Sequence, residues 1–200
     1  MIKKSLIAAS LLLASTSAFA QSKYYVGVGI NTGSGTQTRS YASGGEYETE
    51  YDASSTNIKF GLIKPSGNRL EFTIETIAAD RTGGNAFVQN VNHSDTTSEY
   101  VGYNFDYLFV FNAEDSLKPY IDLGVGLYKN DEITGYSATT GEAETASGIA
   151  LNLGAGLLYG VTDNIEVETA YKMKSISWNL ENPDTSETIN MIYLGVNLTF

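Results

Sequence analysis

The sequence has no cysteine, three prolines, one histidine and one tryptophan, and no long apolar run beyond its first twenty residues. Without cysteine the chain has no disulfide framework and no cysteine-linked lipid anchor. A membrane-spanning helix needs about 20 apolar residues in a row, so transmembrane helices are excluded after the N-terminal segment. The one histidine, His93, cannot build a zinc site, and its polar surroundings are typical of a solvated loop residue. We therefore expect no metal, no cofactor and no enzyme activity.

Acidic residues outnumber basic residues by 23 to 12, which gives a formal net charge of −11 at pH 7. This excess argues against nucleic acid and anionic lipid as partners, because both carry negative charge. The chain contains 14 tyrosines, eight phenylalanines and 20 glycines. This composition favours a β-rich protein with belts of aromatic side chains.

The N-terminus has the pattern of a secretory signal peptide. Two lysines precede a short apolar stretch, and a small-residue cleavage motif follows it: Lys3, Lys4, Leu6–Leu13, Ala18, Phe19 and Ala20. We expect cleavage before Gln21, so that residues 1–20 are removed and residues 21–200 form one domain. The alternative is a retained anchor, which is disfavoured because the apolar stretch is too short to span a bilayer.

The last residues alternate between apolar and small or polar side chains. Counting back from Phe200, every second residue is large and apolar: Leu198, Val196, Leu194 and Ile192. A period of two with one apolar and one polar face predicts a β-strand between two different environments.

Read with the same period, residues 21–200 divide into eight segments. They are Lys23–Asn31, Thr56–Ile63, Arg69–Ile77, Glu99–Phe111, Lys118–Tyr128, Gly148–Tyr159, Ile165–Lys174 and Asn190–Phe200. The second, fourth and sixth connections are short, whereas the other four are long and polar. Short turns at one end and long loops at the other are typical of transmembrane β-barrels, whose short turns are periplasmic.

The two faces of these segments differ in the same way throughout. One face is apolar, and the other carries charged residues: Lys59, Arg69, Glu71, Glu75, Asp106, Lys118, Asp122, Glu166, Glu168, Lys172 and Lys174. In a soluble sandwich or lipocalin the charged face would point outward. However, nine glycines share the charged face, and a narrow lumen needs small residues beside long ones. The pattern predicts an all-β, eight-stranded, antiparallel, up-and-down transmembrane β-barrel with short periplasmic turns and long extracellular loops.

Two motifs and the last residue carry a family resemblance. Lys118–Gly126 and Asn164–Tyr171 look like the fifth and seventh strands of small eight-stranded outer-membrane β-barrels, and Phe200 resembles their aromatic last residue. The chain thus resembles the OmpX/Ail group, the opacity proteins and the OmpA barrel domain. The resemblance implies residence in the bacterial outer membrane, with membrane lipid and lipopolysaccharide as surroundings. It also implies that the barrel-assembly machinery reads the last strand, including Tyr193, Val196, Leu198 and Phe200.

The expected lumen contains five basic and six acidic residues. Such a near balance fits a plug of ion pairs, because the interior of an eight-stranded barrel is only wide enough for side chains. We therefore expect a filled lumen, with the functional contacts in the surface loops: adhesion, host or envelope contact, or envelope integrity. The alternative function is a narrow channel for small or apolar solutes.

Two loop features are candidates for contact. The first is an alternating acidic run formed by Glu46, Glu48, Glu50 and Asp52, with tyrosines between them. It is interpreted either as a strand that offers oxygen atoms to a divalent ion or basic partner, or as a solvated loop that prevents aggregation.

The second feature is Trp178. Outward positions of the seventh segment are odd-numbered, but Ile176, Trp178 and Leu180 are even-numbered. We expect a β-bulge near Lys174–Ser175 that turns these residues outward and places Trp178 at the outer lipid interface. The alternative is a mobile loop after Lys174.

Overall fold

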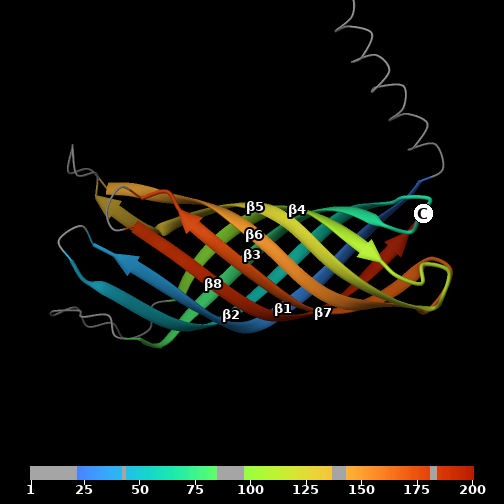
Figure 1. Cartoon of the computed structure of the whole chain (residues 1–200), viewed down its shortest axis with the longest axis horizontal. Coiled ribbons are helices and arrows are strands. Elements are labelled where there is room, and N and C mark those ends of the chain that lie inside the picture. Colours follow the sequence, from blue (N-terminus) through green and yellow to red (C-terminus); the bar gives the residue numbers. More distant parts are fainter. Residues whose placement is uncertain (1–21, 42–43, 85–96, 137–142, 181–183) are drawn as a thin grey trace, which may run out of the picture.

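The computed structural model describes residues 22–41, 44–84, 97–136, 143–180 and 184–200. They form one closed barrel of eight antiparallel strands, as the sequence predicted (Figure 1). The strands are β1 (Lys23–Ser40), β2 (Glu46–Ile63), β3 (Arg69–Gly84), β4 (Thr97–Val110), β5 (Leu117–Tyr136), β6 (Ala143–Gly160), β7 (Ile165–Trp178) and β8 (Asp184–Thr199). No helix in these ranges has the length and hydropathy needed to cross a bilayer. The expected signal peptide with its cleavage site, and His93, lie outside the described residues.

Each strand pairs with its neighbours in the sequence, and the last strand pairs with the first. The β1–β8 ladder runs without a break from Tyr25 opposite Thr199 to Ser40 opposite Asp184. In the lipid-facing part this pairing leaves no strand edge uncovered, so the backbone hydrogen-bonding groups there are satisfied within the barrel. At the far end, β5 beyond Lys129 pairs with β6 alone.

The three short turns follow the expected boundaries. They join Ile63 to Arg69, Val110 to Leu117 and Gly160 to Ile165, at the same end as the C-terminus (Figure 1). The four connections at the other end are shorter than the sequence predicted, because the strands continue and leave connections at 41–45, 85–96, 137–142 and 179–183. Along each strand, the alternation of apolar residues ends before the backbone pairing does. The strand extensions therefore could not be recognised from apolar alternation.

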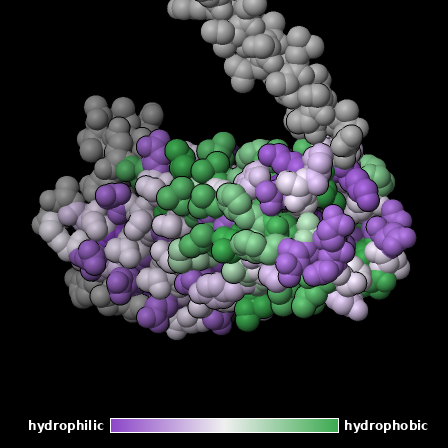
Figure 2. Space-filling model, turned by 45° about the vertical axis from the view of Figure 1, so that its right-hand side comes forward, coloured by the Kyte–Doolittle hydropathy of each residue, from purple (hydrophilic) through white to green (hydrophobic). Residues whose placement is uncertain are grey.

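The outer surface of the barrel has an apolar band with polar residues on both sides (Figure 2). Its side chains point away from the lumen and are exposed: among them Val28, Phe60, Phe105, Leu123, Leu151 and Leu194. Toward the far end, Ile30 is followed by Thr32, Ile149 by Ser147, and Ile192 by Asn190. A strand needs about 9–11 residues to span a bilayer. The 14 to 20 residues of these strands therefore extend beyond the apolar band.

The expected β-bulge near Lys174–Ser175 is wrong, and so is the alternative of a mobile loop. The ladders of β7 with both neighbours run without a register shift as far as Trp178. Trp178 points into the barrel and is 3% exposed. No bulge is needed, because at this height the interior contains apolar residues such as Ile189 and Met191, and the indole of Trp178 donates to the carboxylate of Glu187.

A closed barrel should be heat-modifiable. Boiled and unboiled samples of the protein are expected to migrate differently on a detergent gel, because opening a sheet without free edges is slow. Identical mobilities, together with recovery of the protein in a soluble fraction, would contradict the membrane-barrel assignment.

Candidate functional site in the barrel lumen

The lumen end beside the short turns is closed by one shared carboxylate. Glu166 on β7 forms ion pairs with Arg69 on β3, whose Nη2 donates to Oε1 over 3.0 Å, and with Lys118 on β5, whose Nζ lies 2.6 Å from Oε1. Apolar side chains from β4 and β6 lie beside this group: Leu108, Val110 and Leu158. The network thus ties together strands that are not neighbours in the sheet.

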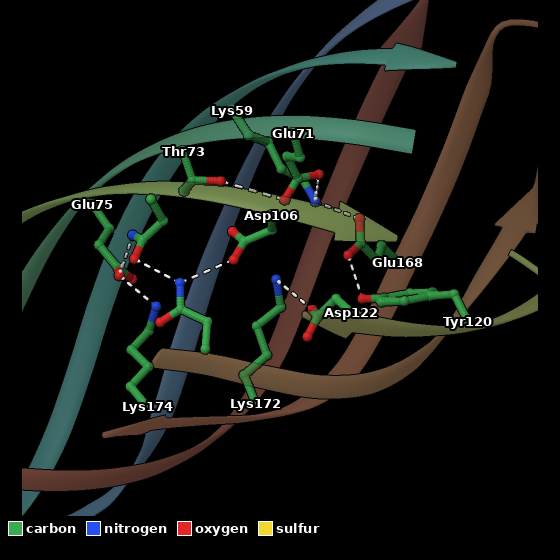
Figure 3. Close-up of polar contacts among 12 residues, drawn as sticks. Lys59, Glu71, Thr73, Glu75, Asp106, Tyr120, Asp122, Glu168, Lys172 and Lys174 are labelled. Carbon is green, nitrogen blue, oxygen red and sulfur yellow. Dashed lines mark hydrogen bonds and ion pairs between the residues drawn. The ribbon is translucent and has the colours of Figure 1, made fainter. Parts of the chain in front are cut away.

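The next level is organised around Lys59 on β2. Its ammonium group lies 3.1 Å from Oε2 of Glu71 and also pairs with Glu168 (Figure 3). Tyr120 donates to Glu168 over 2.6 Å, and Tyr25 donates to Glu71 over 2.7 Å. Lys59 and both of its carboxylate partners are almost completely buried. Such a pair is tolerable because each charge has an opposite charge and further hydrogen bonds.

A third level lies nearer the far end of the lipid-facing band. Lys174 on β7 lies 2.6 Å from Oε1 of Glu75 on β3, which also accepts from Asn104 over 2.8 Å. Lys172 pairs with Asp122 over 3.6 Å (Figure 3). Asp106 is also buried in the lumen, where it accepts a hydrogen bond from Asn152 over 2.9 Å. All eleven charged residues that the sequence assigned to the lumen therefore face it.

The glycines of the charged face make room for these side chains. A Cβ atom at Gly61 would lie 2.0 Å from the ring of Tyr25, and one at Gly195 would lie 2.0 Å from the Tyr193 hydroxyl. Both distances are far below van der Waals contact, and the neighbours are rigid rings. The close approach of glycine backbone and tyrosine ring is what allows eight strands to enclose so many long side chains.

Sequence reasoning missed the part of the interior that lies beyond the lipid-facing band. There, one carboxylate is surrounded by aromatic side chains: Glu187 on β8 accepts from Tyr51, from Tyr100 over 2.6 Å and from the Trp178 indole over 2.8 Å. Glu187 forms no ion pair with the described residues and is buried. Burial and the neighbouring carboxylate raise the pKa of Tyr51, so its hydroxyl stays protonated and continues to donate.

Apolar residues fill the space around this carboxylate: Ala53, Ile77, Ala79, Ala146, Ile176, Leu180, Ile189 and Met191. We call Glu187, its three donors and these residues the aromatic plug. The alternation of Glu187, Ile189 and Met191 with Ser186, Thr188 and Asn190 was the available signal. It was overlooked because the outward residues there are polar.

The acidic run lies on β2, outside the lumen. Glu46, Glu48, Glu50 and Asp52 point outward and are exposed, whereas Tyr51 between them points inward. The interpretation as a strand is thus confirmed, while a ligand for it stays a prediction. Among the described residues, no group of His, Cys, Asp or Glu has the arrangement of a metal site.

The residues expected to form the assembly signal lie on both faces of the last strand. Val196, Leu198 and Phe200 are exposed on the outer surface. Tyr193 points into the lumen, where its ring lies 4.7 Å from Nζ of Lys59 and 4.8 Å from Nζ of Lys172. Tyr193 therefore has a packing role in the charged lumen, and its part in assembly stays a prediction.

The comparisons with known proteins agree with this architecture. A family model described as "Outer membrane protein beta-barrel domain" matches residues 6–200. No curated protein matches the chain. Neisserial surface protein A has a similar structure, with a TM-score of 0.57, 16% sequence identity, and coverage of 88% of this chain and 97% of that chain. At this identity the similarity establishes a shared fold.

Two further solved structures are more distant. The outer membrane protease OmpT from Escherichia coli has a TM-score of 0.47 and 8% identity, and covers 89% of this chain and 97% of that one. Ail of Yersinia pestis, in complex with the heparin analogue sucrose octasulfate, has a TM-score of 0.43 and 18% identity, with coverage of 88% and 99%.

The inward position of Trp178 predicts its fluorescence. In liposomes, neither aqueous iodide nor brominated lipid should quench Trp178 efficiently, because the barrel wall separates it from both. Two control variants in a Trp178→Phe background place the ring outside: Thr188→Trp should be quenched by iodide, and Leu194→Trp by brominated lipid. Strong quenching of native Trp178 by either agent would contradict its place in the aromatic plug.

Proposed function

Because the chain belongs to the outer membrane protein beta-barrel domain family and so resides in the bacterial outer membrane, we propose that it is a sealed scaffold that acts through its outer surface. In this proposal the lumen has a structural role, and contacts are made by the parts of the barrel beyond the lipid. These contacts serve adhesion, host or envelope interaction, or envelope integrity. Catalysis is not part of the proposal.

The observation that carries this proposal is the way in which the lumen is filled. Ion pairs such as Lys59 with Glu168 and Lys174 with Glu75 join opposite walls within the lipid-facing part. Removing one partner of a buried pair typically costs about 3–5 kcal/mol, because a charge is left uncompensated. A path for solutes would have to break several such pairs and also displace the aromatic plug. The filled lumen therefore supports a scaffold over a channel.

Two parts of the chain are candidates for these contacts. The first comprises the connections at 41–45, 85–96, 137–142 and 179–183, which follow strand ends opposite the short turns. The second is the outward acidic run of β2, whose carboxylates are solvent-exposed. Binding residues are often carried by loops on a rigid scaffold, which supports a role for the first part.

The proposed partners follow from the place of each surface. Outer-membrane lipid and lipopolysaccharide surround the barrel wall, and the barrel-assembly machinery contacts the last strand during insertion. The connections and the acidic run bind envelope components or host surface molecules in this proposal. A partner of the acidic run would carry basic groups or a bridging divalent cation.

Separating the two surfaces tests the proposal. One variant has the four connections replaced by short Gly-Ser linkers, and a second carries Glu46→Gln, Glu48→Gln and Glu50→Gln. The measurement is the adhesion of bacteria to host-matrix proteins, or the amount of envelope protein that the barrel retains. At least one of the two variants should lower this value several-fold relative to the native chain. A matched control is Glu114→Gln with Asp163→Asn in the short turns, which should behave as the native chain does.

Folding of each variant is checked by its heat-dependent mobility. Equal retention by the native chain and by both surface variants, at equal amounts of folded barrel, would contradict a role for the outer surface.

A further inference from the structure

Two arginines face the outer end of the lumen, above the aromatic plug. Arg39 on β1 shares the inward face of its strand with Gln37, which is the register partner of Glu187 in the plug. Arg81 on β3 lies directly opposite Tyr51, whose hydroxyl donates to the same Glu187. Paired residues of neighbouring strands point to the same side of a sheet, so both arginines project toward the barrel axis.

Both guanidinium groups are held in place but not neutralised. Nε of Arg39 donates to Oε1 of Gln37 over 2.8 Å, and Nε of Arg81 donates to the carbonyl oxygen of Gly83 over 3.5 Å. Neither arginine forms an ion pair with the described residues, whereas each of the five bases deeper in the lumen does. An anchored Nε orients the two Nη groups, which form the donor fork that recognises an oxyanion.

The surrounding charges leave the two arginines in surplus. Among the described side chains, Glu187 is the one acid that faces this end of the lumen, and its carboxylate already accepts from three donors. The acidic run of β2 points outward, and the inward residues that alternate with it are uncharged: Tyr47, Thr49 and Tyr51. Two positive charges therefore face one buried negative charge, in a chain whose net charge is −11.

We propose that Arg39 and Arg81, which we call the outer mouth, bind a phosphate monoester group that reaches them from outside the cell. A phosphate monoester carries close to two negative charges at neutral pH and so matches two guanidinium groups, whereas a carboxylate carries one. Arginine binds phosphate oxygens through pairs of parallel hydrogen bonds. The phosphates of the surrounding lipid lie on the other side of the barrel wall, away from these inward side chains.

The outer mouth lies outside the seal of the lumen. A phosphate bound there stays above the aromatic plug, so the site does not require passage through the barrel. The carboxylates of the acidic run are exposed on the outer side of the wall, and salt screens exposed charges beyond about 8 Å at physiological ionic strength. The site thus adds an anion to the cationic partner proposed for the acidic run.

Titration with glucose 6-phosphate, followed by ³¹P NMR on the barrel in nanodiscs, tests the site. The native barrel should give a saturable shift that an excess of glucose does not reduce. Arg39→Gln and Arg81→Gln should each weaken binding about tenfold, because each removes a charge-assisted pair of hydrogen bonds. The control variant Lys129→Gln, which removes an exposed outward base near the same end, should bind as the native barrel does.

The absence of a saturable shift, or equal affinity in the native barrel and both glutamine variants, would overturn the proposal. Folding of each variant is checked by its heat-dependent mobility. If a glutamine variant folds poorly, Arg39→Lys and Arg81→Lys keep the charge and lose the fork, and they should still weaken binding. None of these variants changes the connections or the acidic run, so the result is separate from the test of the proposed function.

The lipid of the nanodisc tests the source of the phosphate. Affinity for glucose 6-phosphate should be the same in nanodiscs of phosphatidylcholine and in nanodiscs that contain lipopolysaccharide. Competition by lipopolysaccharide that Arg39→Gln abolishes would show that a membrane phosphate reaches the outer mouth, and would contradict a ligand from outside the cell.

Discussion

Closure of the sheet is the constraint on which the rest of the molecule depends. Eight strands without an edge enclose an interior whose width is set by strand number, so every inward side chain must fit a fixed space. Because Gly61 and Gly195 have no side chain, the rings of Tyr25 and Tyr193 fit against their backbone. The remaining volume is taken by lysine, arginine and glutamate, and their burial requires the ion pairs that cross the lumen.

The interior changes its chemistry along the barrel axis. Within the lipid-facing part it is charged, and beyond that part it becomes an aromatic plug around Glu187. The outer surface changes from apolar to polar in the same direction, for example from Leu194 and Ile192 to Thr188 and Ser186 along β8. Beyond the lipid, the barrel therefore resembles a soluble protein, with an apolar core and a polar surface. This core extends the seal of the lumen past the membrane.

Strand alternation in the sequence predicted the eight strands, the three short turns and the inward place of all eleven lumen charges, because lipid on one side makes the period visible. It did not predict the strand extensions, apart from the acidic run of β2, for which a strand was one of two interpretations. There, Thr36 pairs with Thr188 across β1 and β8, and polar outward residues look like loop. Trp178 was misplaced for a related reason: the interior was expected to stay charged, so an inward indole required a bulge. The convergence of Tyr51 and Tyr100 on Glu187 could not be predicted either, because it depends on contacts across 136 and 87 residues of sequence.

The central claim is that the lumen is filled and sealed at both ends. Single-channel recording in planar bilayers tests it most directly, with the purified, folded barrel at high salt. The account predicts no stepwise conductance from the native chain, because several buried ion pairs and the aromatic plug would have to separate together. Reproducible conductance steps from the native barrel, one for each molecule that inserts, would contradict this account and favour the narrow channel.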